Sequence, residues 1–339
     1  MCMGECGSDC RDINNNLQKS ELTSFENDSV YFQQVIRPML APGHESEFIF
    51  WLKCFGMIPN NQVCKNAAFN QDCNKAMSWV NYRAHDLYQW KCNNCSEKKS
   101  IREGSVFSDV KCNFNNVIRV LLGWCKSYDY ESLAAILDIK KSVICTLYNI
   151  AARVAEDYIK QNIGDFQIGG PNKIVLIDTY PAGCGNYSQN RGHRPILCLC
   201  EVKTIPQKFW FQSLDRTRCS QVVQTNKVKI LQAIREVVRP GSILIAPMEN
   251  NACSYNDLLP LKDMFPTIIS VETLRRHNTN RVCCEDNLDV IWRKALDVCE
   301  QAQFYNHMHI QQYLTSYMWQ QMFGAESFER LLHQFSIHN

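Results

Sequence analysis

Hydrophobic positions in the second half of the chain form short strand-like runs separated by helical patterns. Three strand-like runs come first, at residues 174–178, 196–202 and 208–214. They are followed by a helical pattern at about 220–237, a strand-like run at 242–246, a helical stretch near Leu258, a strand-like run at 267–272 and a helix from Leu288. This succession predicts an α/β domain over residues 171–302.

The order of these elements, β-β-β-α-β-α-β-α, is that of the ribonuclease H-like fold. In that fold the first strand carries a carboxylate at its centre, the fourth strand carries one at its end, and the last helix carries a third. We therefore predict a ribonuclease H-like domain and look for acidic residues at these three positions.

Residues 108–165 show helical periodicity, and we predict a helical unit that contains a helix-turn-helix. The segment YESLAAILD, the turn IKK and the longer segment SVICTLYNIAARVAEDYI have the required order, with Ser142 as the helix N-cap. The first turn of the second helix contacts base edges in such a motif. A plain helical core is the alternative. The side chains expected to face DNA are Lys140, Lys141, Ser142 and Thr146.

The first part of the chain predicts a tail followed by a helical lead-in. Residues 1–30 hold more acids than bases and few large apolar residues, which favours disorder. Cys2, Cys6 and Cys10 recur every fourth residue and could bind metal or carry lipid, but we interpret them as incidental thiols of a flexible tail. Residues 31–58 show the apolar pattern of two short helices that are broken near APG.

A group of cysteines occupies residues 60–104. Its members are Cys64, Cys73, Cys92 and Cys95. The last two form a CxxC knuckle, which places two thiolates on one tight turn, whereas the first two are more widely spaced, so Cys54 and His85 are alternative ligands. The segments AMSWVNY, LYQWKC and KKSIREG alternate as the strands of a zinc ribbon would. Because so polar a segment has few apolar residues for a core, we predict a structural zinc ion.

Composition and charge restrict the class of protein. Hydrophobic residues make up 45% of the chain and charged residues 21%, as in folded proteins, and the net charge of +2 does not by itself indicate a nucleic-acid partner. The 19 cysteines are irregularly spaced and no apolar N-terminal segment suggests a signal peptide, which indicates free thiols in a reducing compartment. No apolar run approaches the roughly 20 residues of a membrane span, so we expect a soluble protein.

Several motifs occur in the order and spacing of one known family. They are the CNNC knuckle that continues into KKSIREGSVFSDVK, then LLGWCKSYDYESLAAILDI, IGGPNKIVLID, NRGH, LDRT, VRPGSILI, NLDVIWRK and QQYLTSYMWQQMFGAESFERLL. In these motifs, from about Gly56 to Phe335, the chain resembles the Merlin-type DDE transposases, eukaryotic relatives of a bacterial insertion-sequence family. The resemblance implies a ribonuclease H-like catalytic domain that follows a zinc ribbon and a helix-turn-helix.

Enzymes of this family hold two Mg²⁺ ions on three carboxylates and cut and join DNA by phosphodiester transfer. The resemblance places the first acid on Asp178 and the third on Asp289, where the family normally has glutamate. The second acid falls on Pro247, which has no side-chain ligand. Glu249 is a substitute on the same face of a strand, roughly 6.6 Å further along. We expect that Glu249 cannot replace the missing metal ligand, because Pro247 disturbs the strand before that point.

Further basic residues, two histidines and an apolar stripe in the C-terminal region also have expected roles. Beyond the helix-turn-helix, the basic residues expected to contact DNA are Lys98, Lys99, Arg102, Arg191, Arg275, Arg276 and Arg293. His307 and His309 have ligand-like spacing, but we interpret them as solvent-facing. The C-terminal helices, residues 303–339, carry an apolar stripe that is predicted to pack on the catalytic-type domain. Its members are Ile310, Tyr313, Leu314, Tyr317, Met318 and Met322.

We therefore expect a transposase-derived protein whose nuclease centre has decayed and which binds double-stranded DNA in the nucleus. Zinc is its expected cofactor, and we do not expect it to be an enzyme. One alternative is a working Mg²⁺-dependent transposase that holds the metals with Asp178, Asp289 and either Glu249 or a bound phosphate oxygen, and the other is a protein-interaction scaffold. Dimers are usual for such transposases, so a homodimer is a further expectation.

Overall fold

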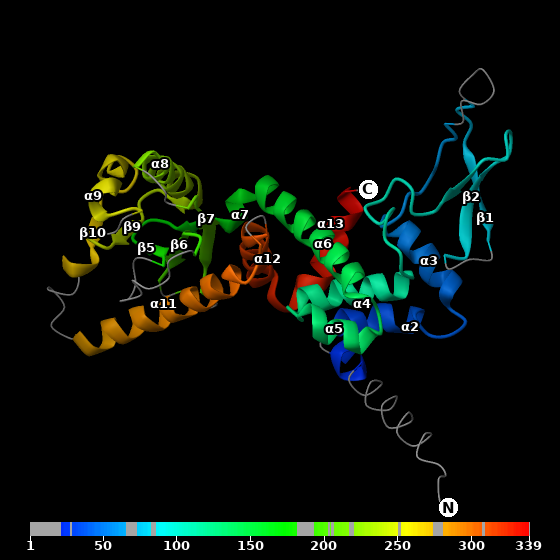
Figure 1. Cartoon of the computed structure of the whole chain (residues 1–339), viewed down its shortest axis with the longest axis horizontal. Helices are drawn as coiled ribbons and strands as arrows, with labels where there is room; N and C mark the ends of the chain where they lie inside the picture. The colour runs from blue at the N-terminus through cyan, green and yellow to red at the C-terminus, as the bar shows by residue number, and fades with distance from the viewer. Residues whose placement is uncertain are drawn as a thin grey trace, which may run out of the picture. The chain divides into compact units, whose positions relative to one another are not determined.

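The computed structural model describes residues 22–27, 29–65, 73–82, 86–181, 193–202, 204, 207–216, 220–249, 252–273, 281–306 and 309–338 (Figure 1). The chain divides into two compact units: Met1–Val154 with Phe323–Asn339, and Ala155–Met322. Helices and strands occur in both units, so the fold is mixed α/β with several sheets. None of the described helices is long and apolar enough to cross a membrane.

A three-stranded antiparallel sheet forms part of the first unit. Its strands are β1 (Met77–Asn81), β2 (Tyr88–Cys92) and β3 (Lys98–Ser100), in that order across the sheet. The three segments that alternate in hydrophobicity therefore form three strands, as predicted. Of the strand residues, only Met77, Trp90 and Cys92 are buried, so the sheet has a very small apolar core.

The lead-in helices are η1 (Phe32–Ile36), α2 (Arg37–Met39) and α3 (Glu45–Cys54). The predicted break falls between α2 and α3, where Gly43 has φ of +92°, a conformation that glycine adopts without steric cost. Lys53 at the end of α3 lies over the sheet, with its Nζ atom 4.4 Å from the ring centroid of Trp79 and 5.1 Å from that of Trp90. Cation–π contacts of this kind hold α3 against the sheet.

The acidic tail was predicted to be disordered throughout, and this is wrong for its last part. Residues 22–27 are helical, and Phe25 and Glu26 are buried. The Glu26 carboxylate accepts hydrogen bonds from Arg37 Nε at 3.1 Å and Arg119 Nε at 2.8 Å, which compensates for its burial. Residues 1–21, with the three regularly spaced cysteines, lie outside the described residues.

Four helices complete the first unit: α4 (Phe114–Cys125), α5 (Tyr130–Leu137), the N-terminal part of α6 (Lys141–Gln161) and α13 (Ser327–His338). Helix α13 packs on α4. Gly123 permits close packing of α4 on α5, because a Cβ atom there would lie only 2.6 Å from Leu133 Cδ2. The sequence placed all the C-terminal helices together, but α13 belongs to the first unit and α12 to the second.

The second unit is built on a five-stranded sheet with the order β10-β9-β5-β6-β7. Strand β5 is antiparallel to β6, as is β6 to β7, whereas β5, β9 and β10 run parallel. The strands are β5 (Ile174–Tyr180), β6 (Ile196–Glu201), β7 (Phe209–Ser213), β9 (Ile243–Ala246) and β10 (Ile268–Ser270). All five coincide with the predicted strand-like runs, within a few residues at each end.

Helices connect and cover this sheet. They are α7 (Ile163–Phe166), α8 (Ser220–Val237), α9 (Tyr255–Leu258), η2 (Leu259–Leu261), α11 (Arg281–Gln303) and α12 (Ile310–Phe323). Strands β4 (Ile168–Gly169) and β8 (Val238–Arg239) form a separate small sheet. The short helix η3 (Gly324–Glu326) belongs to the first unit. Side chains alternate along β5, so Val175 and Ile177 join the core that includes α8. Leu176 and Asp178 point to the other face.

Helix α12 covers the edge of the sheet at β7, as its apolar stripe predicts. Phe211 contacts this helix twice: its backbone N–H lies 3.1 Å from Met318 Sδ, and its ring lies edge-on to Tyr317 with centroids 5.9 Å apart. Gln311 adds a hydrogen bond through its Oε1 atom to the backbone N–H of Ser213 at 2.7 Å. Met322 is the exception in the stripe, because its side chain is 42% exposed.

Candidate metal centre and carboxylate site

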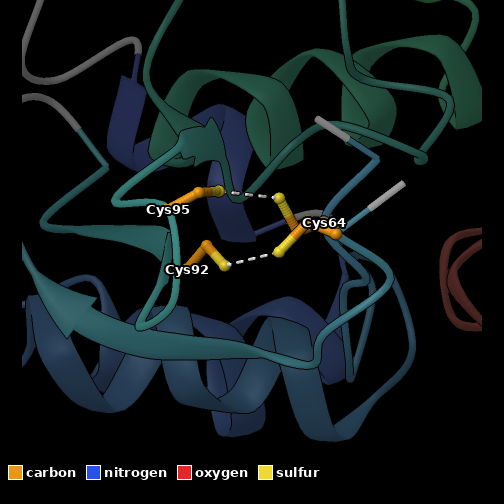
Figure 2. A group of neighbouring side chains, drawn as sticks. Cys64, Cys92 and Cys95 are labelled. Atoms are coloured by element: carbon orange, nitrogen blue, oxygen red, sulfur yellow. Dashed lines mark hydrogen bonds between the residues drawn. The ribbon is translucent and has the colours of Figure 1, made fainter. Parts of the chain in front are cut away.

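Cys64, Cys73, Cys92 and Cys95 form one cluster in the first unit. Their four sulfur atoms lie within 4.8 Å of one another. Figure 2 shows Cys92 and Cys95 pointing toward Cys64. The Sγ atoms of Cys64 and Cys95 are 3.3 Å apart, and those of Cys73 and Cys92 are 3.7 Å apart. A disulfide needs about 2.05 Å, so all four are free thiols.

Backbone contacts explain how the widely spaced first pair reaches the knuckle. Val63 and Ala76 form an antiparallel bridge, and the N–H of Cys64 donates to the carbonyl of Lys75 at 2.9 Å. These contacts hold the segment that contains Cys64 beside the segment that follows Cys73. Cys92 stands at the end of β2, where its N–H donates to the carbonyl of Glu97 at 2.8 Å and closes the turn.

The cluster fits a tetrahedral zinc ion. With zinc–sulfur bonds of about 2.3 Å, tetrahedral geometry places the sulfurs roughly 3.8 Å apart, close to the observed separations. Four thiolates are also the donor set that zinc takes in structural sites. Of the two alternative ligands, Cys54 is exposed and stands outside the cluster, whereas His85 lies outside the described residues. Zinc bound here would join the segment that precedes β1 to the β2–β3 turn at one end of the small sheet, where Met77 pairs with Cys92.

The knuckle also stabilises the thiolate form of Cys92. The backbone N–H of Cys95, followed by that of Asn94, donates to the Cys92 sulfur and lowers the pKa of Cys92 to about 6. Burial instead raises the pKa of Cys112, in the same unit, to about 11. Cys92 is therefore largely ionised at neutral pH, whereas Cys112 is not.

The low pKa of Cys92 predicts zinc binding at neutral and mildly acidic pH. Zinc binds thiolates, so protons should displace it only as the pH falls below about 6, where Cys92 becomes protonated. The zinc content of the protein after dialysis over a range of pH measures this. Release of zinc already at about pH 8 would contradict the low pKa.

Helices α5 and α6 follow each other closely, but Ser142 is not the N-cap of α6. Asp138 ends α5 in a left-handed conformation, and α6 begins at Lys141. The carbonyl of Lys140 already accepts the N–H of Val143 at 2.9 Å, so Ser142 lies inside the first turn. The sequence suggested serine because that residue is a common cap, but α6 begins two residues earlier than a cap at Ser142 would require.

The side chains predicted to face DNA on this helix pair differ in their contacts. Lys140, Ser142 and Thr146 are exposed, and Thr146 Oγ1 donates to the backbone carbonyl of Ser142 at 2.9 Å. Lys141 forms an ion pair with Glu131. On the exposed surface such a pair contributes little stability and can be exchanged for a phosphate.

Arg102 was expected to contact DNA, but its guanidinium is committed to the interior of the first unit. The side chain is 7% exposed and binds both carboxylate oxygens of Asp86, at 2.6 and 2.7 Å. It also donates to the carbonyls of Val110 and Cys112 at 2.8 and 2.7 Å. A bidentate, buried pair of this kind leaves no fork for a phosphate, so Arg102 is a structural residue.

Other predicted cations have mixed outcomes. Lys99 pairs with Glu103 at 2.7 Å, Lys98 is exposed on β3, and Arg293 is exposed on α11. Three predicted arginines, Arg191, Arg275 and Arg276, lie outside the described residues, as does His307, whereas His309 is exposed, as expected.

Asp178 lies in the central strand of the second unit and is only 4% exposed. Its Oδ1 atom accepts the backbone N–H of Thr179 at 2.7 Å. Cys198 stands directly opposite it on β6, and the Cys198 sulfur is 3.4 Å from Cys299 of α11. Burial raises the pKa of Cys198, and the neighbouring thiol and carboxyl add to this effect. The sequence interpretation missed this thiol pair, although LCLC in the strand places cysteines on one face.

Pro247, the first residue after β9, lies level with Asp178 when the register of β5 and β9 is continued. The parallel register pairs Ile174 with Ile243 and Leu176 with Ile245, so two further residues along each strand bring Asp178 level with Pro247. Adjacent strands lie about 4.8 Å apart, which is the distance over which two carboxylates share metal ions. A proline therefore occupies the position at which an acid would complete the pair.

Glu249 does not continue the strand. Strand β9 ends at Ala246, and Met248 and Glu249 form an exposed bend. The alternation that would place Glu249 on the same face as position 247 requires an extended strand, and it is absent there. Glu272 contacts this bend, because its carboxylate accepts the N–H of Met248 at 2.9 Å.

Asp289 lies on α11, in a stretch where only the backbone is described. It is ten residues before Cys299, which corresponds to about 15 Å along a helix axis. Cys299 of α11 contacts Cys198 of β6, the strand beside Asp178. The structure thus brings Asp178 level with position 247 and places Asp289 about three turns before Cys299 on α11.

Comparisons with models of protein families, with curated proteins and with solved structures gave no match to this chain.

Proposed function

We propose that the protein is a DNA-binding derivative of a Merlin-type DDE transposase whose nuclease centre has decayed. The observation that carries this proposal is the parallel register of β5 and β9, which brings Asp178 level with Pro247 just after β9 ends, in a sheet ordered β10-β9-β5-β6-β7. Three antiparallel-connected strands followed by two parallel ones is the order of a ribonuclease H-like domain. Asp178 would be the first acid of such a centre, whereas Pro247 occupies the position of the second.

Loss of one acid is enough to disable two-metal chemistry. Two Mg²⁺ ions about 4 Å apart repel each other, and shared anionic oxygens offset this repulsion. Asp178 by itself supplies one carboxylate in a buried position. If Mg²⁺ bound, Asp178 would hold it and the ion would polarise a phosphate oxygen, but nothing at position 247 could hold a second ion.

The first unit supplies the features that suggest DNA binding. Its cysteine cluster and three short antiparallel strands suit a zinc ribbon, and α5 and α6 suit a helix-turn-helix, with Lys140, Ser142 and Thr146 exposed at the start of the second helix. A protein with these modules and no nuclease activity would act on chromatin in the nucleus by occupying DNA.

Binding of double-stranded DNA tests the proposal. We expect the full chain to bind a duplex at about 50 mM salt and to lose at least tenfold in affinity by about 200 mM, because each lysine–phosphate contact releases a counterion. Lys140→Gln should weaken binding. Lys262→Gln, at an exposed lysine of the second unit, is the control. Fluorescence anisotropy measures both. A wild-type protein that binds no duplex at low salt would favour the interaction-scaffold alternative.

A further inference from the structure

The ribbon sheet, formed by β1, β2 and β3, carries two lysines directly opposite each other. Lys91 of β2 pairs in register with Lys98 of β3, and Ser78 of β1 pairs with Lys91 on its other side. Paired residues project to the same face of a sheet, so these three side chains form one row. The neighbouring row on that face consists of Val80, Gln89 and Ser100.

This face is the one that α3 leaves uncovered. Trp79 and Trp90 project to the opposite face, where Lys53 of α3 lies against their rings. Lys91 directly follows Trp90 in an extended strand and therefore points the other way. Lys98 is exposed and Lys91 partly exposed. The lysine face is thus open to a ligand.

The charges on this face are not balanced within the sheet. Neither row contains an acid, and among the described residues neither Lys91 nor Lys98 forms an ion pair. Their neighbours do: Lys99 pairs with Glu103, and Arg102 pairs with Asp86. Like charges directly opposite each other destabilise a sheet, and a glutamate at either position would remove this cost.

A bound polyanion would neutralise both lysines and so remove the repulsion between them, which favours binding. The two ammonium groups stand on flexible four-carbon stems, so both can contact neighbouring phosphates. Hydroxyl and amide groups of Ser78, Gln89 and Ser100 surround them, and Asn93 Nδ2 donates to Ser78 Oγ at 2.7 Å. Such groups are common phosphate contacts in complexes with DNA. Val80 is the single large apolar side chain in the two rows, which gives an apolar protein partner little to bury.

We propose that the face formed by Ser78, Lys91, Lys98, Val80, Gln89 and Ser100 binds the phosphate backbone of double-stranded DNA. This inference rests on the proposed DNA-binding function and deepens it, because it assigns the contact to Lys91 and Lys98 in place of Lys99 and Arg102. Phosphate contacts carry no sequence information, so this face would position the protein while another element contacts the bases.

One substitution separates binding from folding. Lys91→Glu places a carboxylate opposite Lys98, which should stabilise the sheet while it repels phosphate. We expect the full chain carrying Lys91→Glu to melt no lower than wild type, to keep its zinc, and to bind duplex DNA about tenfold or more weakly. Lys91→Gln and Lys98→Gln should each reduce the slope of log affinity against log salt by about 0.9, the value of one phosphate contact. Lys262→Glu makes the same charge change on the second unit and should alter neither quantity.

The outcomes distinguish the two proposals. If wild type binds the duplex with a clear salt dependence and the variants at Lys91 and Lys98 bind equally well, the face is not the contact, while DNA binding stands. If the variants change zinc retention without changing the salt slope, the lysines only offset the charge of the cysteine cluster, and the inference fails. Tighter binding of single-stranded RNA than of duplex DNA, or no binding of either by wild type, would also overturn it.

Discussion

Replacement of Cys64 by serine is expected to abolish zinc binding and to unfold the ribbon sheet. Wild-type protein should contain about one zinc ion per chain, held by four thiolates. The sheet buries only Met77, Trp90 and Cys92 from its strands, too little for stability of its own. Structural zinc binds zinc-finger peptides with about 10–16 kcal/mol at neutral pH, so loss of a comparable site outweighs the remaining contacts.

Elemental analysis and hydrogen exchange would measure this effect. Amide protons of β1 and β2 should be protected in the zinc form and should exchange rapidly in Cys64→Ser or after chelation. Cys54→Ser is the matched control, because Cys54 is an exposed free cysteine outside the cluster, and it should retain both zinc and protection. A protected sheet in chelated protein would show that Lys53 and the tryptophans stabilise it without metal.

Strands and helices of the second unit could be predicted because each is a short buried run with its own periodicity. The runs that became β5, β6 and β9 are apolar along their length, and burial on both faces requires this. The fourth strand ends at a proline, which the sequence shows directly. The elements that depend on local hydrophobic pattern could therefore be predicted from the sequence.

Pairings between distant residues could not be predicted in the same way. Glu26 belongs to an acidic segment by composition, yet it is buried because Arg119, 93 residues later, reaches its carboxylate. Arg102 follows two lysines and resembles a surface cation, but Asp86 and two carbonyls surround it. Helix α13 packs on α4 although the whole second unit separates them in the chain. None of these contacts leaves a trace in the neighbouring sequence.

The lysine face illustrates an intermediate case. Lys98 was singled out from a run of basic residues, but Lys91 was not, because its significance comes from its position opposite Lys98 across the strand pair. Register is set by the turn between strands, and here the cysteine knuckle forms that turn. The length of the cysteine knuckle therefore determines that Lys91, just before it, and Lys98, just after it, lie opposite each other.

Restoring an acid at position 247 should create a divalent-metal site and make the stability of the second unit depend on that metal. Pro247 is buried and level with Asp178. In Pro247→Asp, two carboxylates would therefore face each other in a place with little water, which destabilises the metal-free protein by several kcal/mol. Mg²⁺ or Mn²⁺ between them would offset the repulsion. At a concentration 100 times its dissociation constant, the ion would return about 2.7 kcal/mol.

Thermal unfolding with and without Mg²⁺ tests this expectation. The melting temperature of Pro247→Asp should lie below that of wild type without metal and rise on adding Mg²⁺, whereas wild type should not respond. Pro247→Asn is the matched control, since it removes the proline without adding charge, and Asp178→Asn in the Pro247→Asp background should abolish the response. Wild type should neither cleave nor join DNA with either ion. Cleavage by wild type that is lost in Glu249→Ala would make Glu249 the working ligand, and an unresponsive Pro247→Asp would place the decay beyond this one residue.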